Sequence, residues 1–282
     1  MHFEILDCVS LPGDPANPNE DAFATDPQGA VVIDGATPVS EPLMPGKSDA
    51  AWLSGFGARR LMAHLKTGAS PRGALRHALA DAERSFAGLR RRAPEVQHEL
   101  PMASMMLAVP SENGFDALWY GDCSAVVLRP CEVAEIVGSA LEKRAGESSA
   151  AQRFVAETGL APIEALKQEK FLPLFRDGRA TVNTPEGTWL FSPVAAASEH
   201  VARQQRTAPA GTLLLLASDG FLALTSDYGC YDAAGLVTAA RDKGLKALAT
   251  ELRAFEAGDP EGRQFPRFKT SDDATAVLLK LV

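Results

Sequence analysis

The chain has few cysteines, no long apolar run and no surplus of basic charge. Its 282 residues include four cysteines, and none forms a C-x-x-C pair or has the spacing of a zinc knuckle. These cysteines are typical of small buried side chains in a reducing compartment. No apolar run approaches the roughly 20 residues needed to cross a bilayer, and the start has no signal-peptide pattern. We therefore predict, by default, a cytoplasmic location and no membrane partner.

The sequence also lacks the features of nucleic-acid binding, of nucleophilic catalysis and of a zinc site. The formal net charge is -8, which argues against a surface that binds nucleic acid or an anionic membrane. The chain has no G-x-S-x-G motif and no C-x5-R phosphate loop, so it offers no convincing nucleophilic side chain. Five histidines lack the H-x-x-x-H and H-E-x-x-H spacings of a zinc site.

Acidic residues beside strand-like apolar runs are the main positive feature. A carboxylate directly after an apolar strand lies at the end of a sheet, and repetition of this pattern along the chain predicts that carboxylates converge at one place. Several carboxylates in a small volume need a strong positive charge to offset their repulsion. Oxygen-only ligands favour Mg²⁺ or Mn²⁺ over zinc. The sequence therefore predicts a site for divalent metal ions.

The order of the elements favours an α+β fold in one domain, 1–282. Strand patterns at the start, middle and end enclose longer helical patterns, and the hairpin turns favour antiparallel pairing. Helices are expected after Ser48 and from Ser70-Pro71, and two more over 233–257, divided near Gly244. The polar, Ala-rich segment of about 134–179 shows no strand pattern and is interpreted as a helical insertion or flap. Strands are expected at 3–9, 21–25, 30–34, 102–109, 115–120, 125–128, 187–191, 213–217 and 274–282.

Five short segments occur in a characteristic order: Asn19-Glu20-Asp21, Ile33-Asp34-Gly35, Tyr120-Gly121-Asp122-Cys123-Ser124, Ala217-Ser218-Asp219-Gly220-Phe221 and Ser271-Asp272-Asp273-Ala274-Thr275. In this order they resemble the metal-dependent serine/threonine protein phosphatases of type 2C, and the resemblance spans nearly the whole chain. It implies a four-layer α-β-β-α sandwich, in which two antiparallel sheets are flanked by helices. It also implies two divalent cations, Mn²⁺ or Mg²⁺, at one end of the sandwich.

The resemblance implies roles for individual residues. Asp34 resembles the carboxylate that bridges the two metals, and Gly35 resembles the glycine whose carbonyl contacts one of them. Glu20 resembles a ligand of that same metal, directly or through water. Asp219 and Asp272 resemble ligands of the other metal. Asp34, Asp219 and Asp272 would thus act in catalysis through metal-bound water.

Three further aspartates belong to the segments that carry this resemblance. Asp21 resembles a residue that orients a metal-bound water. Asp122 holds a turn or supports the site, and the role of Asp273 is left open. The implied reaction is hydrolysis of phosphoserine or phosphothreonine in a phosphoprotein substrate, by water or hydroxide that bridges the metals.

The chain departs from the family pattern at two positions. An arginine that often grips the substrate phosphate is replaced by Ala16, and a histidine common in eukaryotic members is replaced by Ala36. Lys47, Arg267 and Lys269 are conceivable replacements for the arginine, although each is more typical of a surface cation. The missing arginine leaves substrate affinity and identity open.

Two alternative functions follow from these departures. The chain could be a phosphatase-like module that recognises a partner without catalysis, which Ala16 and the unusual 134–179 segment favour. The retained carboxylates weigh against this, because a noncatalytic module has no need to confine so much negative charge. The other alternative is hydrolysis of a small phosphorylated metabolite. The oligomeric state is not predicted.

Overall fold

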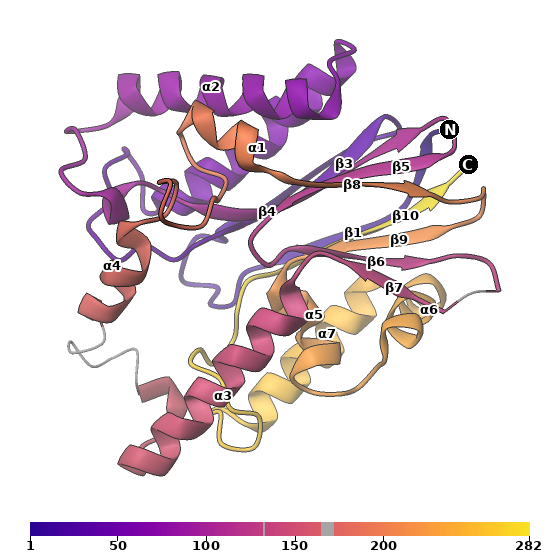
Figure 1. Cartoon of the computed structure of the whole chain (residues 1–282). Helices are drawn as coiled ribbons and strands as arrows, with labels where there is room; N and C mark the ends of the chain where they lie inside the picture. Colours follow the sequence, from indigo (N-terminus) through magenta and orange to yellow (C-terminus); the bar gives the residue numbers. More distant parts are fainter. Residues whose placement is uncertain (132, 165–171) are drawn as a thin grey trace.

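Two five-stranded sheets face each other in the computed structural model of the chain, which describes residues 1–131, 133–164 and 172–282 (Figure 1). One sheet has the strand order β1-β10-β9-β6-β7 and the other β2-β3-β4-β5-β8. The pairings between these strands are antiparallel. Their bounds are β1 Phe3–Leu11, β2 Asp21–Asp26, β3 Gly29–Gly35, β4 Ala103–Ser111, β5 Gly114–Tyr120, β6 Ser124–Leu128, β7 Glu135–Val137, β8 Ala202–Thr207, β9 Leu213–Ala217 and β10 Ala274–Leu281.

Helices cover the outer face of each sheet (Figure 1). Helices α1 and α2 pack on the sheet that contains β3, and α5, α6 and α7 pack on the sheet that contains β9. The result is the predicted four-layer α-β-β-α sandwich, so the expected fold class is confirmed. The helices are α1 Asp49–Lys66, α2 Pro71–Leu89, α3 Ala140–Thr158, α4 Leu172–Ala180, α5 Asp219–Ser226, α6 Ala233–Lys243 and α7 Leu245–Gly258.

The core lies in three layers of apolar side chains. The central layer, between the sheets, includes Val32, Met106, Leu214 and Val277. The two outer layers lie between each sheet and its helices. Because the central strands are covered on both faces, they are continuous apolar runs rather than alternating ones, and all five residues of β9 are buried.

Local signals in the sequence correctly predict several boundaries. The Ser48 hydroxyl accepts a hydrogen bond from the Ala51 N–H at 3.1 Å and caps α1. Ser70 caps α2 in the same way, with Pro71 at the first helical position. Gly244, with φ of +84°, separates α6 from α7 as expected. Among the helices that the structure describes, none combines the length and apolarity of a membrane-crossing segment.

Two strand predictions are wrong. The 187–191 segment forms no strand, and only Phe191 makes an isolated bridge, with Ala103. The edge of that sheet is instead β8, whose polar sequence ARQQRT hides it from a search for apolar runs. In the 134–179 segment, β7 is a short edge strand where no strand was expected.

The rest of the 134–179 segment is helical where the structure describes it. Helix α3 packs against α5, and α4 packs against the short 3-10 helix η1, Gln97–Glu99. In Figure 1 both helices lie toward the left end of the sheets, with α4 above α3. Part of the predicted insertion, 165–171, lies outside the described residues. The predicted single domain and the flap interpretation stay predictions.

Candidate metal centre

Strand ends bring the acidic segments to one end of the two sheets. In one sheet, Asp21 at the start of β2 pairs with Asp34 near the end of β3. In the other sheet, β9 and β10 are neighbours. Asp219 follows the first of these strands, and Asp272 precedes the second. Residues far apart in the sequence therefore reach the same end of the sandwich.

The electrostatics of Asp34 show that these carboxylates are close enough to interact. Burial is the largest cause that raises the pKa of Asp34 well above its ordinary value. The charges of four neighbouring aspartates raise it further: Asp21, Asp219, Asp122 and Asp272. Without a cation, the site therefore resists full ionisation.

Asp21 carries the clearest sign of a missing partner. Its side chain is only 6% exposed, and within the described chain neither carboxylate oxygen has a hydrogen-bond partner. Burial raises the pKa of Asp21 to about 8, although the neighbouring hydroxyls of Ser218 and Thr275 lower it. These two hydroxyls lie close enough to lower the pKa but do not meet the geometry of a hydrogen bond to either oxygen. A buried carboxylate without a counter-charge or a well-formed hydrogen bond is costly. The side chains around Asp21 would offer a metal ion oxygen ligands, which Mg²⁺ and Mn²⁺ prefer.

A lysine lies against the same carboxylates. The Lys269 ammonium donates to Asp272 Oδ1 at 2.7 Å. Burial disfavours this ammonium, but the charges of Asp272, Asp34 and Asp219 outweigh that effect and raise the pKa of Lys269. Of the three cations considered as phosphate binders, Lys269 is therefore the one that the structure brings to the carboxylates.

The side chains are not arranged as a finished metal cage. Among the described residues, no group of three or more His, Cys, Asp or Glu side chains is placed so that it could hold a metal ion. One Asp272 oxygen is already paired with the Lys269 ammonium and would have to leave it to bind a metal ion. The donor chemistry thus fits divalent ions, while binding would require some of these side chains to reorient.

Glu20 and Gly35 are held together by close backbone contacts. The Gly35 N–H donates to the Glu20 carbonyl oxygen at 3.1 Å. A Cβ atom on residue 35 would lie 2.6 Å from that oxygen, so only glycine fits there. The Ser48 hydroxyl, at the start of α1, donates to Glu20 Oε1 at 2.5 Å. Burial is the largest cause that raises the pKa of Glu20.

Asp273 connects separate segments of the site. Its Oδ1 accepts the Gly13 N–H at 2.7 Å, and its Oδ2 accepts the Glu20 N–H at 2.6 Å. Asp273 therefore fixes the backbone of Glu20 relative to the start of β10. Asp122 accepts a short hydrogen bond from the Ser104 hydroxyl and lies in the turn between β5 and β6. The supporting role expected for Asp122 stays a prediction.

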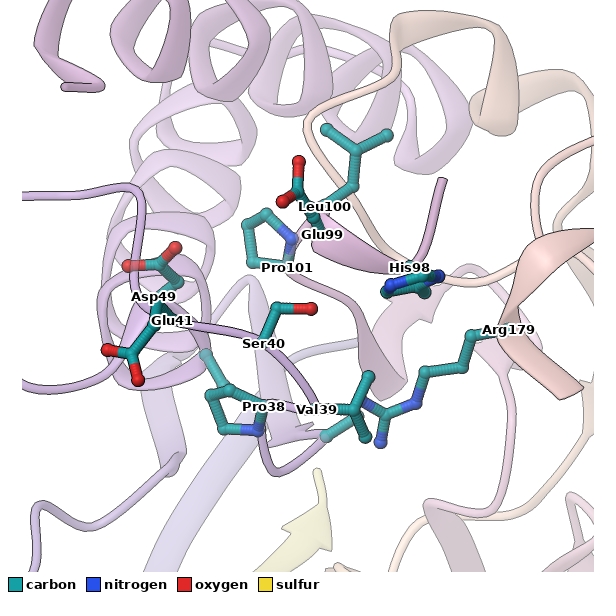
Figure 2. A pocket seen from close by; sticks show the side chains of 12 residues that line it. Pro38, Val39, Ser40, Glu41, Asp49, His98, Glu99, Leu100, Pro101 and Arg179 are labelled. Carbon is teal, nitrogen blue, oxygen red and sulfur yellow. The ribbon is translucent and has the colours of Figure 1, made fainter. Parts of the chain in front are cut away.

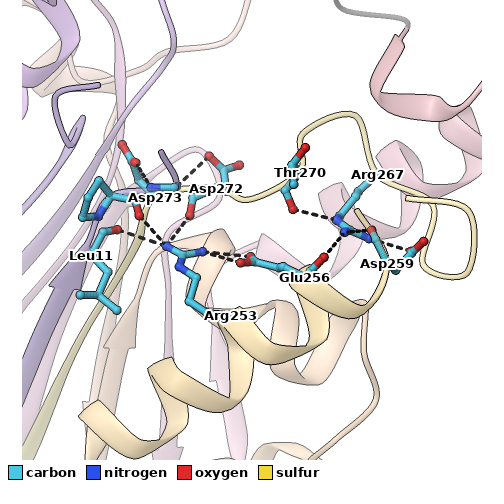
Figure 3. A network of polar contacts seen from close by, with 10 residues as sticks. Leu11, Arg253, Glu256, Asp259, Arg267, Thr270, Asp272 and Asp273 are labelled. Carbon is cyan, nitrogen blue, oxygen red and sulfur yellow. Dashed lines mark hydrogen bonds and ion pairs between the residues drawn. The ribbon is translucent and has the colours of Figure 1, made fainter. Parts of the chain in front are cut away.

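Arg253 on α7 fixes the backbone next to the site (Figure 3). Its Nη2 donates to the carbonyl oxygens of Pro12 at 3.0 Å and Asp272 at 2.9 Å, and more weakly to Leu11 at 3.4 Å. Its Nη1 pairs with the buried Glu256 carboxylate at 2.7 Å. One side chain thus joins the loop after β1 to the segment that carries Asp272.

The other two candidate phosphate binders lie in different surroundings. The prediction for Arg267 is wrong because its side chain is buried, paired with Asp259 at 2.9 Å and hydrogen bonded to carbonyl oxygens that include those of Phe265 and Thr270. Lys47 is exposed in the loop before α1. Among the described residues, Lys47 forms no ion pair or hydrogen bond with the carboxylates.

Sequence reasoning missed the supporting roles of Ser48 and Arg253. Ser48 is recognisable as a helix cap, but its contact with Glu20 joins residues 28 positions apart. Arg253 is an ordinary cation of an amphipathic helix in the sequence. Its acceptors outside α7 are backbone carbonyls, which carry no sequence signature.

Comparisons with solved structures agree with this fold. The serine/threonine phosphatase PstP/Ppp of Mycobacterium tuberculosis matches over 100% of this chain and 99% of its own, with a TM-score of 0.56 and 16% identity. A structure of the PstP catalytic domain in complex with two manganese ions matches over 100% and 99% of the two chains, with a TM-score of 0.51 and 16% identity. PppA, a regulatory component of the type VI secretion system in Pseudomonas aeruginosa, matches over 100% and 99%, with a TM-score of 0.54 and 18% identity. No protein-family model and no curated protein sequence matches the chain. The predicted resemblance is thereby confirmed for the fold.

Proposed function

We propose that the chain is a metal-dependent phosphatase that hydrolyses phosphate monoesters, with phosphoserine and phosphothreonine in proteins as its substrates. The observation that carries this proposal is the buried Asp21 carboxylate, which lies among other carboxylates without a hydrogen-bond partner in the described chain. The fold shared with solved serine/threonine phosphatases supports it. A cytoplasmic location stays a prediction.

The residues present can be assigned to two cations, Mn²⁺ or Mg²⁺. Asp34 would bridge them, the Gly35 carbonyl and Glu20 would serve one, and Asp219 and Asp272 would serve the other. When bound, two such ions would activate water and neutralise charge on the phosphoryl oxygens. The manganese complex of the structurally similar PstP domain supports this choice of metal.

The chain's own groups prepare the site for this chemistry. The Ser48 hydroxyl orients the Glu20 carboxylate, and Asp273 fixes the Glu20 backbone. Arg253 holds the Asp272 carbonyl and so fixes the backbone from which the Asp272 side chain extends. Lys269 supplies a positive charge next to Asp272. This charge would attract an anionic substrate to the carboxylate end of the sandwich.

The test is hydrolysis of p-nitrophenyl phosphate during a manganese titration, with and without chelator. Wild-type protein should be active only with metal, and Asp34→Asn should abolish turnover while the fold survives. Asp242→Asn is the matched control because Asp242 lies exposed on α6 and pairs with Arg241. Metal-independent turnover, or full activity of Asp34→Asn, would refute the proposal. A panel of phosphopeptides, sugar phosphates and nucleotides separates protein substrates from small metabolites.

A noncatalytic binding module is the second candidate. The observation that favours it is the Lys269–Asp272 ion pair, since a lysine already offsets part of the negative charge. Isothermal titration with Mn²⁺ distinguishes the two candidates. The phosphatase should bind the metal and release Asp272 from the lysine, whereas a module that uses Lys269 as its permanent counter-charge should bind none.

A further inference from the structure

The phosphate-binding cation expected near Ala16 has no replacement in its own loop. Ala16 is exposed, and its N–H donates to Asp14 Oδ1 at 2.9 Å within a local turn. The same loop, 12–18, contains no lysine or arginine. A cation that grips the phosphoryl group must therefore come from another segment.

Helix α4 brings two arginines onto the loop that follows Asp34 and Gly35. Arg176 Nε donates to the Val39 carbonyl at 3.0 Å, and Arg179 Nη1 donates to the Thr37 carbonyl at 2.8 Å. Because the two arginines are three residues apart, they lie on the same face of the helix. Figure 2 shows Arg179 extending from α4 toward Val39.

Arg179 is the arginine nearer to the carboxylates. Arg179 lines one cavity with Ala36 and Ala50, and a Cβ on Gly35 would lie 3.0 Å from the Ala50 Cβ, so this cavity adjoins the Gly35 backbone. Burial lowers the pKa of Arg179, and the charge of Glu20 opposes that effect. Thr37, whose carbonyl oxygen accepts this hydrogen bond, lies in the loop that directly follows Asp34 and Gly35. Arg176 instead lines a separate cavity of ≈ 500 Å³ with Gln97 and other residues of the η1 region.

Most of the hydrogen-bonding capacity of Arg179 is unused by the described chain. A guanidinium has five N–H donors, and one of these is used, by Thr37. Arg179 also lines a small cavity of ≈ 20 Å³ that contains Asp49 and Glu99 (Figure 2). Both carboxylates already have partners: Asp49 accepts two backbone N–H groups, and Glu99 pairs with Arg92. In the described residues, Arg179 forms no ion pair.

We propose that Arg179 binds the phosphoryl group of the substrate and takes the place of the cation missing at Ala16. This inference rests on the proposed function and adds a residue to it. Planar guanidinium groups match phosphate oxygens through two parallel hydrogen bonds, which an ammonium cannot do. The hydrogen bond to Thr37 fixes the guanidinium beside Glu20 and leaves other donors for the anion.

The experiment measures binding of inorganic phosphate to manganese-saturated protein by calorimetry, together with KM and kcat for p-nitrophenyl phosphate. Arg179→Ala should weaken phosphate binding and raise KM by about 10- to 100-fold, the usual effect of losing hydrogen bonds to a charged group. Arg179→Lys should recover part of the loss. Manganese affinity should stay within about twofold of wild type. Arg176→Ala is the matched control because it removes a neighbouring contact of α4 to the same loop.

Each outcome decides the proposal. Unchanged phosphate binding in Arg179→Ala overturns it. An equal loss in Arg176→Ala also overturns it, since both arginines would then only attach α4 to the loop. Circular dichroism confirms that each variant is folded, and Arg179→Lys serves if the alanine variant is not.

The failure of this proposal can be distinguished from failure of the proposed function. If wild-type protein hydrolyses no phosphomonoester but binds phosphate through Arg179, the enzymatic function fails and the Arg179 site stands. If wild-type protein is an active phosphatase and Arg179→Ala binds phosphate equally well, the function stands and the Arg179 site fails. Wild-type protein that binds no phosphate also overturns the Arg179 site.

Discussion

Replacing Arg253 with methionine should reveal how strongly α7 supports the site. The variant loses the ion pair with Glu256, whose side chain is 5% exposed, and the hydrogen bonds to the carbonyls of Pro12 and Asp272 (Figure 3). Breaking a buried ion pair costs about 3–5 kcal/mol because the remaining charge has no partner. The Arg253 side chain is 25% exposed, so we expect the lower end, about 3 kcal/mol.

A second substitution separates the two parts of this loss. Arg253→Met combined with Glu256→Leu removes the unpaired charge and should recover most of the ion-pair cost. It should still lack the hydrogen bonds to the backbone carbonyls, worth about 1 kcal/mol each. The double variant should therefore remain less stable than wild type and bind Mn²⁺ more weakly, because the Asp272 backbone is no longer fixed.

Urea unfolding of the metal-free protein measures these differences in the free energy of unfolding. Arg241→Met is the control because its ion pair with Asp242 is exposed, and it should change stability by less than about 0.5 kcal/mol. If Arg253→Met loses less than about 1 kcal/mol, or no more than the control, Arg253 does not support the site in the way described.

Three further perturbations test neighbouring parts of the molecule. Hydrogen bonding from Arg92 lowers the pKa of Glu99 from its ordinary 4.5 to about 2. The ionised Glu99 carboxylate should therefore contribute its full stabilisation above about pH 4.5 and lose it as the pH falls toward 2. Glu99→Gln should have a lower melting temperature than wild type at pH 7. A difference in melting temperature that stays constant down to pH 2 would contradict this. A Cβ on Gly220 would lie 2.0 Å from the Asp273 carbonyl oxygen, so Gly220→Ala should lower the free energy of unfolding by about 1–3 kcal/mol, whereas Gly88→Ala, in open space on α2, should raise it by about 0.5–1 kcal/mol. Asp273→Asn weakens its acceptance of two backbone N–H groups and should weaken Mn²⁺ binding about 10- to 100-fold in calorimetry; unchanged affinity would remove its positioning role.

The strands of the core could be predicted from the sequence because their environment is uniform. β9 is covered by helices on one face and by the other sheet on the opposite face, so each of its residues is apolar. β8 could not be found in this way. It lies at a sheet edge, where its side chains are exposed or half-buried and polar, so no apolar pattern marks it as a strand.

The convergence of the acidic residues at one end of the sheets could also be predicted, but the contacts that hold them there could not. Asp34 and Asp219 stand out because an aspartate follows or ends a buried strand. Arg253 and Arg179 have no such signal, since both donate to backbone carbonyls of segments more than 140 residues away in the sequence. Arg267 was expected at the site for a related reason, because its contacts also depend on the fold rather than on a local sequence pattern. Its proximity to Asp272 in sequence suggested the site, whereas the fold buries it against Asp259.

The most direct test is anomalous scattering from crystals grown with manganese. We predict two manganese ions bound by oxygen atoms of Asp34, Asp219 and Asp272, with Lys269 displaced from Asp272. Crystals that show no manganese at these aspartates, and in which Lys269 is still paired with Asp272, would contradict the proposal. This end of the sandwich would then not be a metal centre, whether or not the protein is active.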